Sequence, residues 1–449
     1  MSPGSTKLLG MRVMKFGGTS IGDPSRIREV GRLISDPIPK IVVLSAMSGT
    51  TNDLVTYTEY LYSRDERNAK LFLANLKDKY LRVVEQLFAT AEYRQTGRRL
   101  IDTHFGYLME FNQDLFTLYE EKAVLAQGEL ISTALVHYHL LESGRQNVLL
   151  PALNFMRIDK DQEPDNFYIR ENLMRELGQH KDCSLFITQG FICRNAYGEI
   201  DNLKRGGSDY SASIIGAAVE ADEIQIWTDI DGFHNNDPRY VNDTTRIDRL
   251  SFSEAAELAY FGAKILHPTS IRPAQDKKIP VRLKNTMNPG SPGTLISGEM
   301  TGSGLKAVAA KDGITAIRIH SDRMLLAFGF LRKVFEIFES HRTPIDMIAT
   351  SEVSVSMTID QNANLKEIVR DLKAYGTVEV VPGQTIICVV GDMIADNKGI
   401  AVQVFEALRE IPIRMISYGS SNNNISVLVS TSDKKNALNA LSDHLFRNL

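Results

Sequence analysis

The chain has 449 residues, with 51 Lys and Arg against 55 Asp and Glu, which gives a formal net charge of −4. This balance argues against a protein that binds nucleic acid through clustered positive charge. Apolar residues make up 43% and charged residues 24% of the chain, a composition that excludes wholesale disorder. At roughly 150 residues per domain, the length predicts about three domains.

The sequence carries no signal for export or membrane insertion. No apolar run approaches the roughly 18 residues that a membrane span needs, and residues 1–10 lack the apolar core of a signal peptide. Cys183, Cys193 and Cys388 are odd in number and form no CxxC pair, so we expect reduced, packed thiols. We therefore expect a cytoplasmic protein that binds neither membrane nor nucleic acid and has no metal site built from side chains alone.

Short apolar runs alternate with helical patterns through the first 300 residues. Residues 26–34 and 211–221 have helical spacing, and residues 66–141 are charged and helical in period. The strand candidates are residues 11–16, 40–47, 147–155, 184–192 and 223–230. This alternation predicts an α/β fold with a mostly parallel sheet. Ligands then bind beyond the carboxyl ends of the strands, where the Gly-rich loops lie.

A loop rich in Gly and Pro, residues 286–304, marks the end of the first predicted domain, and an internal repeat follows it. The repeated pieces are residues 334–336 with 404–406, 344–348 with 412–416, and 353–355 with 425–427. Each copy predicts a helix, a Pro turn, a strand, a loop and an alternating strand. Paired units of this kind usually sense ligands or dimerise, although they could simply enlarge the core.

Lys15 precedes Gly17-Gly18 at a predicted strand-to-helix junction. Glycines let backbone N–H groups approach an anion, and the N-terminus of the following helix favours negative charge. A lysine there could neutralise a transferring phosphoryl group. A tight turn beside a surface lysine is the alternative. The chain contains no GxxxxGK[ST] motif, so a P-loop enzyme is not supported.

Two further groups could contact an amino-acid ligand. Arg205 stands before Gly206-Gly207 and suits a bidentate carboxylate clamp, with Asp209 or Ser208 capping the next helix. An exposed arginine beside a helix cap is the alternative. Glu129 lies in an apolar helical stretch, where an acid is costly unless it is paired. Its partner is either a ligand ammonium group or an internal salt bridge.

Several motifs occur in a fixed order along the chain. They are KFGGTS at 15–20, VVLSAMSGTTNDL at 42–54, QGE at 127–129, TQGF at 188–191, RGGSDYSA at 205–212, WTDIDG at 227–232, DPR at 237–239 and FGAKILHP at 261–268. Together they resemble the aspartate kinases of the amino-acid kinase superfamily. The repeat resembles the tandem regulatory ACT domains of that family, with TSEVSVSMTID at 350–360 as a close match.

The resemblance implies an amino-acid kinase fold, a three-layer αβα sandwich with a mainly parallel sheet, over residues 11–300. Two ferredoxin-like ACT units (βαββαβ) are implied over residues 305–449. The first, residues 321–382, is expected as an insertion into the second, which combines residues 305–320 with 383–449. The family usually dimerises through these units, so a homodimer is expected, with a tetramer as the alternative.

The implied activity is transfer of the γ-phosphoryl group of ATP, bound with Mg²⁺, to the side-chain carboxylate of L-aspartate. The product, 4-phospho-L-aspartate, leads to lysine, methionine and threonine, and an end product, lysine by resemblance, is the implied feedback inhibitor. A kinase for glutamate, N-acetylglutamate or a nucleotide is an alternative. A non-catalytic amino-acid sensor on a kinase scaffold is another.

The resemblance also implies residue roles. The catalytic set is Lys15, Gly17, Gly18 and Asp209. The substrate set is Thr51, Glu129, Phe191, Arg205, Gly206, Gly207 and Ser208. The ATP set is Ser45, Thr228, Asp229, His234, Arg239, Lys264 and Ile265. The effector set is Met324, Ala327, Phe330, Leu331, Pro344, Ile345, Asp346, Ser351 and Glu352. His234 stands where a family member has a nucleotide-contacting Tyr, and Ala327 and Pro344 replace small polar residues of a lysine-inhibited member.

Overall fold

The computed structural model describes residues 10–112, 115–203, 206–262, 266–299, 304–321, 328–392, 396–419 and 421–447. Contacts between Cα atoms divide the chain into two compact units. The first unit is Met1–Gly232 with Leu266–Gly298, and the second is Phe233–Ile265 with Glu299–Leu449. Residues 233–265 therefore group with the repeat region rather than with the rest of the predicted kinase domain.

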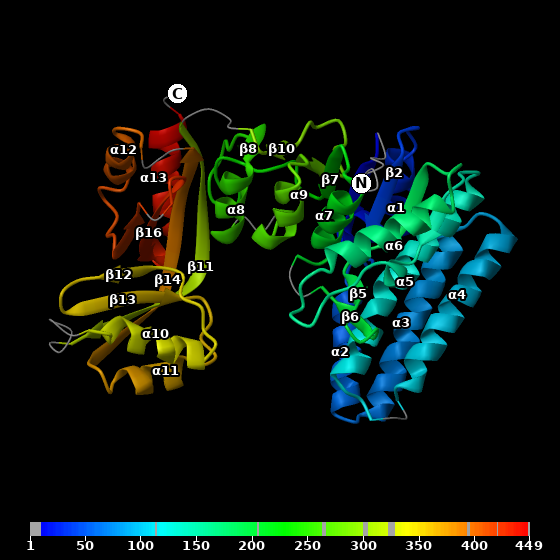
Figure 1. The fold of residues 1–449 in the computed structure, drawn as a ribbon, viewed down its shortest axis with the longest axis horizontal. Helices are drawn as coiled ribbons and strands as arrows, with labels where there is room; N and C mark the ends of the chain where they lie inside the picture. The colour runs from blue at the N-terminus through cyan, green and yellow to red at the C-terminus, as the bar shows by residue number, and fades with distance from the viewer. Residues whose placement is uncertain are drawn as a thin grey trace, which may run out of the picture. The chain divides into compact units, whose positions relative to one another are not determined.

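A mainly parallel sheet forms the centre of the first unit (Figure 1). In spatial order the strands that the first unit contributes to it are β3 (Val148–Leu150), β4 (Leu185–Gln189), β2 (Lys40–Leu44), β1 (Arg12–Phe16), β7 (Glu223–Thr228), β9 (Val281–Asn285) and β10 (Thr294–Ser297). Every neighbouring pair from β3 to β9 is parallel, and β10 is antiparallel to β9. Every residue of β2 and β4 is buried, which explains their unbroken apolar runs. The predicted parallel sheet is confirmed.

Helices cover both faces of this sheet, so the unit has the three predicted layers. On one face α5 (Leu118–Glu142) packs against β2, β3 and β4, and α1 (Pro24–Leu33) contacts α5. On the other face α7 (Gly207–Val219) packs against β1, β2 and β7. The remaining elements are α2 (Thr50–Tyr62), α3 (Glu66–Leu87), α4 (Ala91–Glu110), α6 (Asn166–Gly178), α9 (Arg272–Asp276), the short helices Gly18–Ile21, Ala152–Asn154 and Pro268–Ile271, and the hairpin β5 (Ile192–Arg194) and β6 (Ile200–Asn202).

The predicted helical stretch 66–141 consists of three helices, α3, α4 and part of α5. Thr90 caps α4 by accepting a hydrogen bond from the Tyr93 N–H, and Thr117 with Glu120 forms a capping box at the start of α5. These caps satisfy the free N–H groups at each helix start. The helical period predicted the helices, whereas their ends depend on these local polar contacts.

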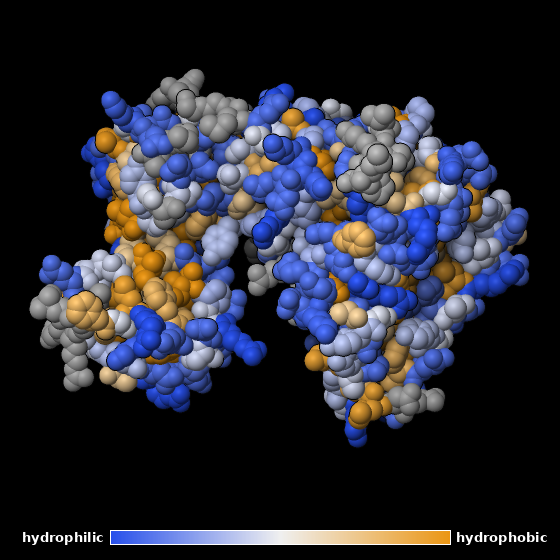
Figure 2. Space-filling view, in the orientation of Figure 1, coloured by the Kyte–Doolittle hydropathy of each residue, from blue (hydrophilic) through white to orange (hydrophobic). Residues whose placement is uncertain are grey.

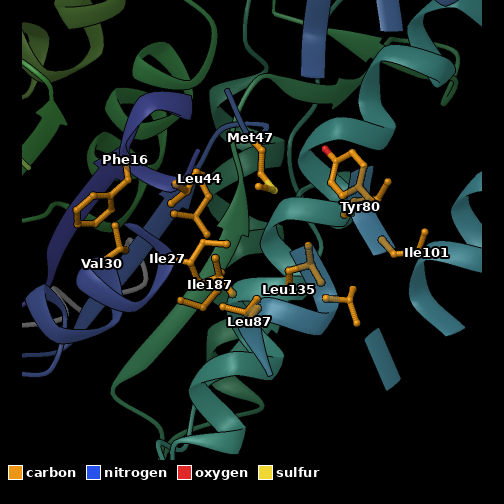
Figure 3. Packing of buried hydrophobic residues seen from close by; sticks show 14 of the residues in the cluster. Phe16, Ile27, Val30, Leu44, Met47, Tyr80, Leu87, Ile101, Leu135 and Ile187 are labelled. Atoms are coloured by element: carbon orange, nitrogen blue, oxygen red, sulfur yellow. The ribbon is translucent and has the colours of Figure 1, made fainter. Parts of the chain in front are cut away.

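A large apolar core joins the sheet to α1 and α5 and to the helices packed on them. Figure 3 shows side chains from β1, β2 and β4 meeting those of α1, α3, α4 and α5. The labelled residues are Phe16, Ile27, Val30, Leu44, Met47, Tyr80, Leu87, Ile101, Leu135 and Ile187, all of them buried. Complete burial of one such aliphatic or aromatic side chain stabilises a fold by about 1.5–3 kcal/mol. This core therefore fixes the strands whose ends form the site.

An antiparallel sheet and the helices on it form most of the second unit. In spatial order its strands are β12 (Ile348–Thr350), β13 (Ser354–Ile359), β11 (Gly304–His320), β14 (Thr377–Asp392), β16 (Asn424–Ser430) and β15 (Met415–Tyr418). The helices of the two repeats are α10 (Phe330–Ser340), α11 (Leu365–Leu372), α12 (Ile400–Ala407) and α13 (Lys434–Phe446), with a short helix at Thr431–Asp433. The unit also contains β8 (Arg249–Ser251) and α8 (Phe252–Tyr260).

The long strands β11 and β14 serve both repeats. Residues 304–311 pair with 386–392, whereas residues 315–320 pair with β13 and with 377–381. One apolar core lies under α10 and α11, and a separate core lies under α12 and α13. The predicted internal repeat is confirmed as two similar halves that share one sheet. No helix among the described residues is long and apolar enough to cross a membrane.

Two glycines of α4 differ in their surroundings and give a matched test of the packing. A Cβ atom at Gly97 would lie 2.8 Å from Phe88 Cε2 and 2.9 Å from Val84 Cγ1, whereas one at Gly106 would meet nothing within 4 Å. We expect Gly97→Ala to lower the free energy of unfolding by about 1–3 kcal/mol through overpacking. Gly106→Ala should raise it by about 0.5–1 kcal/mol because alanine favours the helix. Thermal unfolding of both variants checks this, and equal stability would contradict the close α3–α4 contact.

Candidate active site

The candidate site lies at the carboxyl ends of four neighbouring parallel strands, β4, β2, β1 and β7. Backbone hydrogen bonds join the first residue after one strand to the end of the neighbouring strand: Gly17 N–H to Trp227 O (3.3 Å), Ser45 N–H to Phe16 O (3.2 Å) and Gly190 N–H to Leu44 O (2.8 Å). β1 lies between β2 and β7: the chain crosses from β1 to β2 on one side and later adds β7 on the other side. Ligand crevices of open α/β sheets form at such a point.

Lys15, in β1, places a positive charge at the carboxyl ends of these strands. Its Nζ lies 2.7 Å from Oδ1 of Asp209 in the first turn of α7, and the two side chains are only 12% and 17% exposed. A Cβ atom on Gly17 would lie 3.4 Å from the Lys15 Nζ, so the ammonium group sits close over the glycine backbone. The structure thus brings together Lys15, Gly17 and Asp209, three members of the predicted catalytic set.

The loop after β2 packs directly onto Gly18. A Cβ atom at Gly18 would lie 2.8 Å from the Ala46 carbonyl oxygen, which is too close for any other residue without a shift of the loop. Ser45 O accepts a hydrogen bond of 2.7 Å from Ser132 Oγ on α5. The prediction did not include Ser132, although it lies three residues after Glu129 and so on the same face of the helix.

Glu129 is 4% exposed and lies beside this loop. Its Oε1 accepts a hydrogen bond of 3.1 Å from the Ala46 N–H, and its Oε2 has no hydrogen-bond partner among the described residues. Burial raises the pKa of Glu129 to about 8, and the positive charge of Lys15 counteracts only part of that shift. Within the described part of the chain Glu129 forms no salt bridge, which favours a ligand ammonium group as its partner.

The start of α7 closes the site from the other face. Gly206 and Gly207 have φ angles of +72° and +47°, a backbone that glycine adopts without strain. Ser208 then receives a hydrogen bond of 2.9 Å from Ser45 Oγ. The predicted capping by Asp209 or Ser208 is wrong, because the N-cap is Gly206 and no side chain caps the helix. Asp209 instead holds Lys15, and the N-terminus of α7 retains its positive dipole.

Phe191 and Thr51 flank this region less tightly. Phe191 has a φ of +66°, and its N–H donates to Ser211 Oγ at 2.8 Å on α7. Gly190, one residue earlier, lies so close to α7 that a Cβ atom there would be 2.4 Å from the Ser208 Cβ. Thr51 is exposed in the first turn of α2. The strand β4 and the helix α7 are therefore held together at the site, whereas the Thr51 side chain is exposed.

The predicted ATP set is divided between the two units. In the first, Thr228 Oγ1 donates to Asp229 Oδ1 at 3.1 Å, and Thr228 O accepts from the Thr286 N–H at 2.8 Å. In the second, His234 Nδ1 lies 3.0 Å from Thr244 Oγ1. The Arg239 side chain is 74% exposed and pairs with Asp237 at 2.7 Å, so its guanidinium is accessible to an anion.

Five predicted residues lie outside the described part of the chain: Arg205, Lys264, Ile265, Met324 and Ala327. The other effector residues lie at the start of α10 (Phe330, Leu331) and on both sides of β12 (Pro344, Ile345, Asp346, Ser351, Glu352). Phe330 is buried in the core under α10, whereas Leu331 is exposed. The Asp346 side chain is 2% exposed and already pairs with Lys311 at 2.7 Å. The prediction included neither Lys311 nor this pairing.

Comparison with known proteins agrees with this architecture. Residues 10–285 match the model of the amino acid kinase family, and residues 387–445 match a model of the ACT domain. The first match covers more than half of the chain. The parallel sheet, with glycine-rich loops at the carboxyl ends of its strands, is therefore that of an amino acid kinase.

Similar proteins of known function identify the kind of amino acid kinase. The lysine-sensitive aspartokinase 3 of Escherichia coli (strain K12) is 34% identical over 447 residues, which cover 97% of this chain and 99% of that protein. The crystal structure of E. coli aspartokinase III with aspartate and ADP (R-state) has a TM-score of 0.83 at 33% identity, covering 97% of this chain and 100% of that one. Its complex with lysine and aspartate (T-state) has a TM-score of 0.81 at 32% identity with the same coverage. This chain belongs to the aspartokinases.

The raised pKa of Glu129 predicts a stability that depends on pH. A carboxyl group with a folded pKa of about 8 and an ordinary value of 4.5 binds more protons in the folded state. Stability therefore falls as pH rises between these values. We expect Glu129→Gln to match the wild type at about pH 5 and to have a higher Tm at about pH 8, measured without substrate.

Glu110→Gln, at an exposed position of α4, is the matched control and should leave the pH dependence of Tm unchanged. If the Tm difference between Glu129→Gln and the wild type did not change with pH, Glu129 would not be the buried proton-binding group.

Proposed function

We propose that the protein is a feedback-regulated aspartate kinase that transfers the γ-phosphoryl group of ATP to the side-chain carboxylate of L-aspartate. One observation carries this proposal. At the carboxyl ends of the parallel strands, the Lys15 ammonium group lies near the buried carboxyl group of Glu129, whose Oε2 has no hydrogen-bond partner among the described residues. Lys15 suits a phosphoryl group, and Glu129 suits the ammonium group of an amino acid. The named relatives bind aspartate, ADP and lysine, which supports the same ligand set here.

The chemistry needs no general base. A carboxylic acid with an ordinary pKa near 4 is ionised at neutral pH, so the substrate carboxylate is already a nucleophile. Its oxygen forms a bond to the γ-phosphorus while the bond from that phosphorus to the β,γ-bridging oxygen breaks. ADP leaves with the electron pair. Catalysis then consists of positioning and of neutralising charge on the transferring group.

Lys15 supplies that neutralisation, and Asp209 keeps its ammonium group over Gly17. The close approach of the loops at Gly18 leaves backbone rather than side chains beside the transferring group, and the N-terminus of α7 adds positive potential. This gives Lys15, Gly17 and Gly18 their catalytic roles. Asp209 acts through Lys15, so we regard it as a positioning residue.

For L-aspartate we propose that Glu129 accepts the α-ammonium group and that Arg205 clamps the α-carboxylate. The ammonium group would supply the partner that Glu129 Oε2 lacks among the described residues and would keep the carboxylate ionised. The remaining members of the proposed substrate set are assigned from the resemblance. They are Thr51, Phe191, Gly206, Gly207 and Ser208.

ATP is assigned to the strand ends beyond β7, with Mg²⁺ bound to its phosphate oxygens as part of the substrate complex. Within the first unit, Thr228 with Asp229 offers polar groups at the end of β7. Within the second unit, the exposed Arg239 suits an anion. Ser45, His234, Lys264 and Ile265 complete the proposed set.

The regulatory proposal concerns residues 305–449. We propose two ACT units, residues 321–382 within residues 305–320 and 383–449, and a catalytic domain over residues 11–300. Lysine is the proposed effector. Figure 2 shows apolar surface over the strands of this sheet, and Ile348, Ile416 and Tyr418 of its edge strands are exposed. Such edges are usually covered in a native assembly, which supports a homodimer through this region. A cytoplasmic location stays a prediction.

The test is formation of an acyl phosphate from L-aspartate and ATP with Mg²⁺, trapped as the hydroxamate. We expect turnover with aspartate and none with glutamate or N-acetylglutamate. Lys15→Met should lower kcat by about 10²–10³-fold, the usual effect of removing one electrostatic contact to the reacting group. Chelation of Mg²⁺ should abolish turnover.

Lys77→Met is the matched control, because it removes an ion pair with Asp102 between α3 and α4 without touching the site. It should retain the wild-type kcat. A folded enzyme without turnover on aspartate, or a Lys15→Met variant with the wild-type kcat, would contradict the proposal.

A further inference from the structure

Two residues of opposite charge stand at a bulge in the middle of β11. The register of β11 against β14 shifts between the pairs Lys311↔Ile386 and Ile314↔Gln384. Residues before this bulge pair with the part of β14 that joins β16, and residues after it pair with β13. Lys311 and Asp312 therefore lie at the junction of the two repeats.

Each of these residues binds a different repeat. Lys311 Nζ lies 2.7 Å from Asp346 Oδ1 and 2.9 Å from Asp360 Oδ2, both in the first repeat. Asp312 accepts hydrogen bonds from Lys434 Nζ at 2.6 Å and from Thr385 Oγ1 at 2.8 Å, on the side of the second repeat. The junction is thus held by ion pairs on both sides, and the Lys311 pair involves a residue of the predicted effector set.

The Lys311 pair extends to the end of α8. The hydroxyl of Tyr260, the last residue of that helix, donates to Asp346 Oδ1 at 3.0 Å. Lys311 Nζ also lies 4.6 Å from the centroid of the Tyr260 ring, within the range of a cation–π contact. Burial lowers the pKa of Lys311, but its hydrogen bonds to Asp346 and Asp360 outweigh burial and the net shift is upward. Lys311 therefore keeps its charge.

The chain after α8 packs closely against β11. Gly262 has a φ of +123°, and a Cβ atom there would lie 2.0 Å from the Ala310 carbonyl oxygen. Only glycine allows this approach. The next residues in the chain, 263–265, include Lys264 and Ile265 of the proposed ATP set. A displacement of β11 at Lys311 must therefore reach the segment that leads into those residues.

We propose that Lys311 is a positioning residue that, with Asp346 and Tyr260, couples the effector segment 344–352 to α8 and the residues after it. The inference rests on the proposed function and names the side chains through which regulation acts. The Asp346 carboxylate is already occupied by the Lys311 ammonium and the Tyr260 hydroxyl. An effector that binds to residues 344–352 must therefore displace or break this bridge. The displacement reaches α8 through the Tyr260 hydroxyl.

The experiment compares Tyr260→Phe and Lys311→Met with the wild type in the full-length enzyme. Tyr260→Phe removes only the hydroxyl and keeps the ring, so it tests the proposal even if Lys311→Met does not fold. Two quantities are measured: the Kd of L-lysine by calorimetry and the inhibition of kcat by L-lysine at saturating substrates. We expect both variants to bind L-lysine at least as tightly as the wild type, because the bridge no longer has to be broken, and to be inhibited less, with at least about fivefold more kcat remaining at saturating L-lysine.

Asp312→Asn is the matched control, because it breaks the ion pair on the other side of the same bulge. It should be inhibited like the wild type. The proposal is overturned if Tyr260→Phe keeps full inhibition, or if it loses L-lysine binding, since Tyr260 would then support the effector site itself. A wild-type enzyme that phosphorylates aspartate but binds no L-lysine overturns this coupling and leaves the kinase proposal intact, whereas absence of turnover contradicts the kinase proposal.

Discussion

The ion pair between Lys15 and Asp209 joins the end of β1 to the first turn of α7, and the geometry of the site depends on it. The pair fixes the Lys15 ammonium group above Gly17, where no side chain covers the backbone. In the same turn Ser208 bonds to Ser45 and lies against Gly190, so these contacts and the ion pair together hold α7 against the sheet. An enzyme that works by positioning needs such rigidity, since catalysis depends strongly on sub-ångström placement.

Glu129 is the counterpart on the other face. Burying a carboxylate with one free oxygen costs stability, and the apolar helix α5 offers it no internal cation. The fold tolerates this cost at a position where a substrate ammonium group would remove it. Affinity for the substrate and stability of the empty enzyme are then opposed at a single side chain, as is common where a site is built for a ligand.

The sequence predicted those features that are local or periodic. The buried runs of β2 and β4 identified a parallel sheet, and the Gly-Gly turn after Lys15 identified the functional edge. Other features depend on contacts between distant residues. The role of Asp209 follows from Lys15, almost 200 positions earlier in the chain, whereas the local sequence predicts only a helix cap from an aspartate in the first turn. The grouping of residues 233–265 with the repeat region follows from contacts such as that of Tyr260 with Asp346. No short-range pattern contains this information.

The bulge in β11 limits how the regulatory region can change. Neighbouring strand residues point to opposite faces, and a slip of one residue exchanges them. Deleting one residue of this bulge, such as Gly313, would move the charge of Lys311 toward Lys434 and that of Asp312 toward Asp346 and Asp360. Two attractive pairs would become repulsive at once. Insertions and deletions should therefore be excluded from the middle of this strand even where its sequence varies.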